Sequence, residues 1–200
     1  MNGTKMMCVV AALTLSGAAV AGPAWTYADL GAFVGDSDGK DEETQGIALR
    51  GSFGFADIWH VQAEVATGDA DGGKSEPSGA DVTWYGIRGG VHPSITDNTD
   101  FVLDLGYTNM EMDFGGSKPD TDTIDIRTGV RSNVGPVELR AFVSLGFFDG
   151  SGSNNEGRDV SYTVGAQYNF SPAWAVGVDA NVTDSDNLAD IYVRWNFGNN

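Results

Sequence analysis

Charged residues near the middle of successive chain segments are the first feature of this sequence that could do chemistry. Taken in order along the chain, their signs mostly alternate: Asp29, Arg50, Glu64, Arg88, Asp104, Arg127, Arg140, Asp179 and Arg194. If the segments are neighbouring strands, oppositely charged residues that face each other lie close enough to form ion pairs. Closing the sheet would place Arg194 beside Asp29, and only Arg127 next to Arg140 breaks the alternation. The pattern predicts a central charge network, because unpaired buried ions are costly.

This network has two interpretations, and both use the same residues. In the first, ion pairs fill the interior as a structural plug, with Glu64 shared between Arg50 and Arg88. In the second, the same charges form the selectivity constriction of a narrow pore. The two interpretations differ in whether water passes between the side chains.

A catalytic site built on histidine is not expected. The only two histidines, His60 and His92, stand at the ends of segments that lie away from the acidic loops. No histidine-assisted nucleophile can therefore be assembled among those loops. We expect no enzymatic activity and no cofactor, and we interpret both histidines as ordinary interior or rim residues.

The segments between the charged strands are rich in acidic residues, and one of them begins like a calcium-binding loop. Asp36, Asp38 and Asp41 have part of the required spacing, but Lys40 occupies a ligand position and Gly39 comes one place early. We treat these three aspartates as a weak calcium candidate. The more general expectation is a hydrated acidic face that attracts divalent cations.

The elements that carry these residues are β-strands, because apolar residues alternate with small or polar ones throughout. Helical periodicity is absent after the N-terminal apolar run. We predict about ten strands, with eight as the runner-up, each long enough to cross a bilayer at a tilt. The predicted strands are 25–34, 44–55, 58–67, 81–92, 100–111, 122–132, 137–148, 159–170, 174–183 and 189–197.

The connections alternate in length, which is a second and independent signal. Long Gly-, Asp- and Ser-rich loops follow the first, third, fifth and seventh strands, and short turns such as Ala56-Asp57 follow most even-numbered ones, while the ninth connection, 184–188, is shorter than expected. The connection over 93–99 is longer than this pattern requires. Long loops on the outside and short turns in the periplasm are typical of outer-membrane barrels, so both chain ends are predicted to be periplasmic.

Alternation alone does not distinguish a membrane barrel from a soluble one such as a lipocalin, but the contents of the two faces favour a membrane. Aromatic residues on the apolar faces gather near the two strand ends, as interfacial girdles do. The cations on the polar faces are arginines, which suit desolvated pairing with carboxylates. Nine glycines also fall on polar faces, as if to leave room for long side chains: Gly31, Gly54, Gly86, Gly90, Gly106, Gly129, Gly146, Gly165 and Gly177.

The N-terminus predicts export. Lys5 precedes an apolar run over 6–20, and Ala19 and Ala21 form a small-residue cleavage pattern. We predict a signal peptide over 1–21 and a single domain over 22–200. The only cysteine, Cys8, lies in the signal, so the mature chain has no thiol chemistry. The net charge of −17 argues against nucleic-acid partners.

The loop alternation, the hairpin over 165–174 and the last strand, Ile191 to Phe197, resemble small porin-like barrels of the OmpA and OmpX type. The chain departs from their terminal aromatic residue, because Gly198 follows Phe197, and it lacks a peptidoglycan-binding domain. The resemblance implies a closed up-and-down antiparallel transmembrane β-barrel in the outer membrane of a Gram-negative bacterium. Expected partners are outer-membrane lipid, lipopolysaccharide, the assembly machinery and divalent cations at the loops. The expected role is a narrow porin-like channel or a structural surface protein; the alternative is an adhesion or interaction protein that uses its acidic loops.

Overall fold

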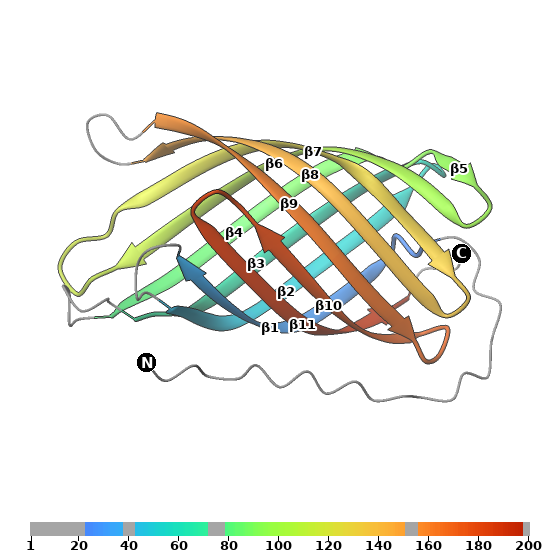
Figure 1. Cartoon of the computed structure of the whole chain (residues 1–200), viewed down its shortest axis with the longest axis horizontal. Helices are drawn as coiled ribbons and strands as arrows, with labels where there is room; N and C mark the ends of the chain where they lie inside the picture. Colours follow the sequence, from blue (N-terminus) through green and yellow to red (C-terminus); the bar gives the residue numbers. More distant parts are fainter. Residues whose placement is uncertain (1–22, 38–42, 72–78, 151–155, 198–200) are drawn as a thin grey trace.

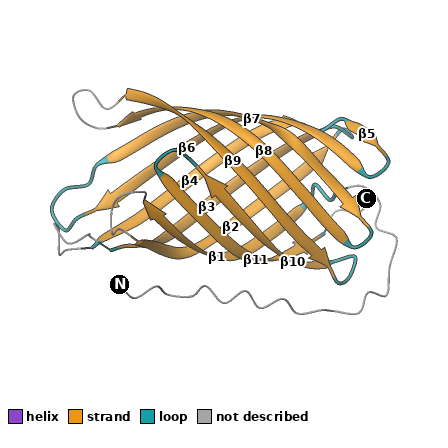
Figure 2. Ribbon diagram, in the orientation of Figure 1, coloured by secondary structure: helices purple, strands orange, loops and turns teal. Residues whose placement is uncertain are grey.

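The computed structural model describes residues 23–37, 43–71, 79–150 and 156–197, and this part of the chain consists of strands joined by turns and loops (Figure 2). Among these residues no helix is long and apolar enough to cross a membrane. The strands are β1 (Tyr27–Ser37), β2 (Glu43–Phe55), β3 (Trp59–Ala70), β4 (Ala80–Val91), the short β5 (Ser94–Thr96), β6 (Thr99–Asp113), β7 (Asp120–Val134), β8 (Val137–Gly150), β9 (Glu156–Asn169), β10 (Trp174–Val182) and β11 (Asp186–Asn196).

The ten long strands form one closed antiparallel barrel (Figure 1). Each pairs with its neighbour along the chain, and two further pairings complete the circle. Strand β1 pairs with β11, and β4 pairs with β6, so that β5 adds only a short ribbon to one end of β6. Closure leaves no long strand with an unpaired edge, which protects the sheet from edge-to-edge association.

The predicted strands are confirmed to within a few residues at each end. The barrel has ten long strands, and eight, the runner-up, is wrong. The fourth connection, which was too long for the pattern, contains β5. The short turns and both ends of the barrel chain lie together in Figure 1, and Phe197 donates a backbone hydrogen bond to Thr26 there.

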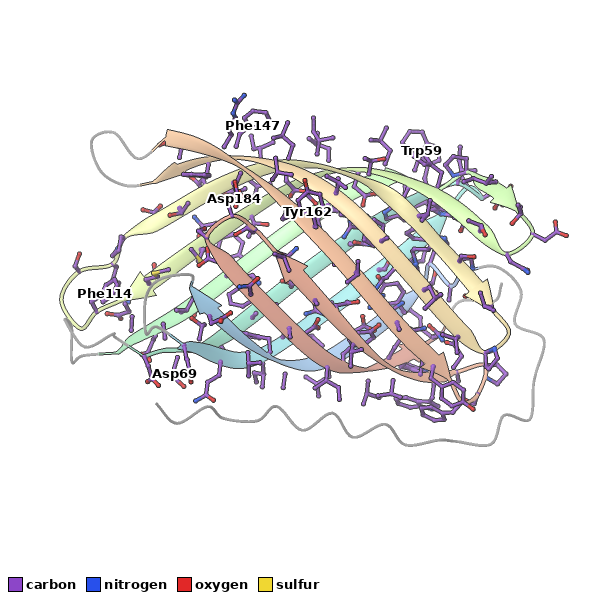
Figure 3. The ribbon with its side chains drawn as sticks, in the orientation of Figure 1. Trp59, Asp69, Phe114, Phe147, Tyr162 and Asp184 are labelled. Atoms are coloured by element: carbon purple, nitrogen blue, oxygen red, sulfur yellow. The ribbon has the colours of Figure 1, made fainter. Side chains whose placement is uncertain are left out.

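The apolar faces of the strands point outward, all around the barrel. Leu30, Ile47 and Leu105 are more than half exposed, whereas the polar faces are enclosed. In Figure 3, Trp59 projects from the wall near the short turns and Phe147 projects nearer the opposite end. An apolar exterior of this extent is the reverse of a soluble barrel, whose apolar face fills the core. The predicted orientation of the faces is therefore confirmed.

Candidate functional site

The lumen holds the charged residues predicted from the sequence. Arg194 donates two hydrogen bonds to Asp29, from Nε to Oδ1 and from Nη2 to Oδ2, both 2.7 Å long. These two residues are 1% and 2% exposed. They lie directly opposite each other on β11 and β1, so closure of the barrel brings together residues 165 positions apart. This forked geometry is the strongest form of carboxylate recognition by arginine.

Two further predicted contacts between adjacent strands are present. Arg50 Nε lies 2.6 Å from Glu64 Oε2, and Arg127 Nε lies 2.8 Å from Asp104 Oδ2. Arg50 also contacts a partner that was not predicted, Asp190, at 2.5 Å. Arg50 therefore links carboxylates on both sides of β1, because Glu64 lies on β3 and Asp190 lies on β11.

Other ion pairs reach across an intervening strand, and each crosses a glycine. Arg140 on β8 binds Asp179 on β10 at 2.7 Å and 2.6 Å, and Gly165 on β9 lies opposite both residues. A Cβ atom at Gly165 would overlap Asp179 Oδ1 and would lie 2.8 Å from Arg140 Nε. The glycine is required because these two side chains occupy the space above it.

The same arrangement occurs at two other places. Arg88 on β4 contacts Asp125 on β7 at 3.0 Å, across Gly106 on β6. His60 Nε2 lies 2.9 Å from Asp104 Oδ1, and Gly90 separates the two residues in register. Three of the glycines predicted to leave room for lumen side chains, Gly90, Gly106 and Gly165, therefore lie directly beneath ion pairs.

Several predicted neighbours are not in contact, because the registers stagger the charges along the barrel axis. Glu64 lies opposite Gly86, so its predicted sharing between Arg50 and Arg88 does not occur. Its second partner is Trp84, whose Nε1 donates to Glu64 Oε1 at 2.5 Å. Arg88 lies opposite Gly106, two residues away from the level of Asp104.

Two more expected contacts are wrong for the same reason, and a third pair is in register but forms its ion pairs elsewhere. Arg127 lies opposite Ser144, whereas Arg140 lies opposite Arg131. Asp179 lies opposite Asp190 and not opposite Arg194. Asp29 and Arg50 are in register, but their ion pairs are made with other residues.

Sequence reasoning missed several buried lumen residues. Arg131 and Glu138 form a forked pair at 2.9 Å across the turn between β7 and β8. Their spacing about the Gly135-Pro136 turn is a sequence signal that could have identified this pair. Further residues missed from the network include Asp125, Asp190 and Tyr192.

One layer of side chains narrows the lumen near the short turns, and we call it the Trp25 layer: Trp25, His60, His92, Val102, Arg131 and Phe142. The Trp25 indole stacks on His92 with ring centroids 4.0 Å apart, and its Nε1 donates to Asp100 at 2.8 Å. Its apolar neighbours are Val102 and Phe142. Arg131 lies over the indole, with Cζ 4.2 Å from the ring centroid. Both histidines are buried here, away from the loops.

The Trp25 layer makes stability depend on pH through His92, which follows the end of β4. Burial lowers the pKa of His92 below its usual value, and the neighbouring His60 lowers it further. The folded state therefore binds this proton less readily than the unfolded state does, so its stability falls as pH drops below about 6.5. We expect a lower free energy of unfolding at pH 5 than at pH 7, measured by urea titration in detergent. His92→Gln should reduce this difference, and an unchanged difference would contradict the assignment.

Two cavities occupy the lumen on the loop side of the Trp25 layer. The central cavity has a volume of about 360 Å³ and is bounded by Trp25, Tyr27 and Phe142 among other residues. The loop-side cavity has a volume of about 570 Å³ and is bounded by residues such as Met110 and Phe148. Four residues line both cavities, which places them at the junction: Arg88, Arg127, Thr163 and Asn181.

The weak calcium candidate is only partly visible. Asp36 is exposed at the end of β1, and Asp38 and Asp41 lie outside the described residues. Among the residues that the structure describes, no group of three or more His, Cys, Asp or Glu side chains could hold a metal ion. On the outer wall, Asp69, Asp81 and Asp113 stand opposite one another on β3, β4 and β6.

Comparisons with known proteins agree with this architecture. A family model described as the outer membrane protein beta-barrel domain matches residues 7–198. The β-domain of the Bordetella autotransporter BrkA has a TM-score of 0.52 at 9% sequence identity, covering 88% of this chain and 100% of that one. The NanC porin has a TM-score of 0.49 at 14% identity, with 84% and 100% covered. No curated protein sequence matches the chain significantly.

Proposed function

The chain belongs to the outer membrane protein beta-barrel domain family, and from this premise we propose that it is a narrow channel for small solutes. The observation that supports the proposal is the pair of adjoining lumen cavities, about 570 Å³ and about 360 Å³. They extend from the loop side to the Trp25 layer. A barrel that served only as a membrane anchor would gain stability from filling this space.

The ion pairs set the size of solute that such a channel could pass. The central cavity is bounded by paired guanidinium and carboxylate groups that span an intervening strand along the wall, such as Arg140 with Asp179. Charged side chains at a constriction select solutes by size and by charge. In this proposal the structural interpretation and the selectivity interpretation both apply, because the same ion pairs stabilise the barrel wall and line the channel.

We also propose that the protein is not an enzyme and that the N-terminal signal directs its export to the outer membrane of a Gram-negative bacterium. It is supported by the position of His60 and His92, which are buried in the Trp25 layer at the end of the lumen remote from the loops. The residues of the predicted signal over 1–21 lie outside the described part of the chain.

The channel proposal predicts that Trp25→Ala increases single-channel conductance in a planar bilayer. Trp25 bounds the central cavity and fills the layer between that cavity and the short-turn end, so a smaller side chain should widen the path. The matched control is Trp174→Ala, because Trp174 is 45% exposed on the outer wall. Silence of both the wild type and Trp25→Ala would contradict a channel and favour a purely structural barrel.

A second role in surface interaction is favoured by the row formed by Asp69, Asp81 and Asp113. Like charges directly opposite on neighbouring strands repel each other, and cations relieve that repulsion. Asp113 already pairs with Lys118 at 2.9 Å, so we propose that the row attracts divalent cations loosely, without a defined metal site, and in this way draws lipopolysaccharide phosphates to the barrel. A barrel with this role alone would remain silent in the conductance experiment.

A further inference from the structure

Six arginines line the central cavity, and each of them is paired with a carboxylate. Four carboxylates line the same cavity, and three more stand behind the lining, where Asp125, Asp104 and Glu138 pair with Arg88, Arg127 and Arg131. The cavity therefore has no excess of positive charge, and an anionic ligand would have to bind N–H donors that these ion pairs leave over.

Two guanidinium groups of this cavity each have a buried N–H donor that no acceptor satisfies. Arg194 is 1% exposed, and its Nη1 is buried without a hydrogen-bond partner, while its Nε and Nη2 bind Asp29. Arg88 Nε is likewise buried without a partner, although Arg88 Nη2 contacts Asp125. A buried charged donor without an acceptor is unfavourable, so each such atom requires an explanation.

The position of Arg88 gives it contact with solutes from the loop side. Arg88 and Arg127 line both cavities and are the charged residues at the junction between them. Thr163 and Asn181 stand at the same junction, and the Asn181 amide donates to the Thr163 hydroxyl at 2.8 Å. Two guanidinium groups with neutral hydrogen-bonding neighbours are the chemistry that recognises a carboxylate or a phosphate.

We propose that the junction and the central cavity form a binding site for a small oxyanion, a carboxylate or phosphate group, with Arg88 as its main ligand. Arg127 and Arg194 line the same cavity, and Arg194 offers its unpartnered Nη1. The central volume of about 360 Å³ limits the ligand to a small molecule. This inference rests on the proposed channel, because it names the class of solute that the channel would take.

The experiment measures binding directly, by isothermal titration of the folded full barrel in neutral detergent with sodium phosphate and, separately, with sodium acetate. The two ligands distinguish a phosphate site from a carboxylate site. Arg88→Gln should weaken binding about tenfold, as expected for the loss of one charge-assisted contact. Asp125→Asn should strengthen binding, because it releases Arg88 from its carboxylate partner.

The critical outcome is that Arg88→Gln weakens anion binding and Asp125→Asn strengthens it. Both variants break the same ion pair, so a purely structural effect would change binding in the same direction in both. Arg158→Gln is the control, since Arg158 is exposed and lines neither cavity. If Arg88→Gln does not fold, Asp125→Asn alone decides. Absence of binding of either anion to the wild type, or a change in the same direction in both variants, would overturn the proposal. A silent barrel that binds oxyanions would contradict only the channel, and a conducting barrel that binds none would contradict only this inference.

Discussion

Asp29→Asn is expected to lower the free energy of unfolding of the barrel by about 3 to 5 kcal/mol. Asp29 accepts two hydrogen bonds from Arg194, and both residues are almost completely buried. Removing one charge leaves the guanidinium of Arg194 in the lumen without its counter-ion, and the cost of that desolvated charge is larger than the net value of the intact pair. The pair also joins β1 to β11, where the barrel closes.

Urea titration of the barrel in phospholipid vesicles measures this loss, with folded protein followed by its altered migration on gels. The double variant Asp29→Asn with Arg194→Gln should recover part of the stability, because it removes both charges together. Lys118→Gln is the surface control. Lys118 pairs with Asp113 at 2.9 Å but is 60% exposed, so no measurable change is expected. Equal losses in the single and double variants would show that the charge pair is not the cause.

Gly165→Ala should destabilise the barrel by about 3 kcal/mol although it adds only one methyl group. The new Cβ atom would overlap Asp179 Oδ1 and crowd Arg140 Nε. Both are ends of flexible side chains, so the backbone can stay in place while the ion pair separates. The expected cost is therefore that of a broken buried ion pair, which is larger than the small intrinsic preference of a strand for alanine over glycine.

Gly89→Ala is the matched control, because Gly89 also lies within a strand, and the nearest atom to a Cβ there is 3.9 Å away. That variant should be as stable as the wild type or slightly more stable, since alanine restricts the unfolded chain. Urea titration of both variants in the same vesicles makes the comparison. A similar loss in both would indicate a general intolerance of side chains at strand glycines, and would contradict the role assigned to Gly165.

The sequence by itself determined the strands, their number and the direction of their two faces. Alternation such as that of Ile47, Leu49 and Phe53 with polar or small neighbours depends only on residues that are adjacent in the chain. Contacts between residues directly opposite each other on paired strands could also be predicted, as Arg50 with Glu64 shows. The contact between Asp29 and Arg194 required one further assumption, that the barrel closes.

Only the tertiary structure decided which charges meet across two strands and where the lumen is narrowest. Arg88 contacts Asp125 because the registers of β4, β6 and β7 align these residues with Gly106 between them. A shift of two residues in either register would keep every side chain on its face and still change the partner of Arg88, so alternation carries no information about this contact. The contacts of Trp25 in the lumen were hidden for a similar reason, since its neighbours His92 and Phe142 come from distant parts of the chain. The sequence lists the charges of the lumen, and the relative register of ten strands determines how they pair.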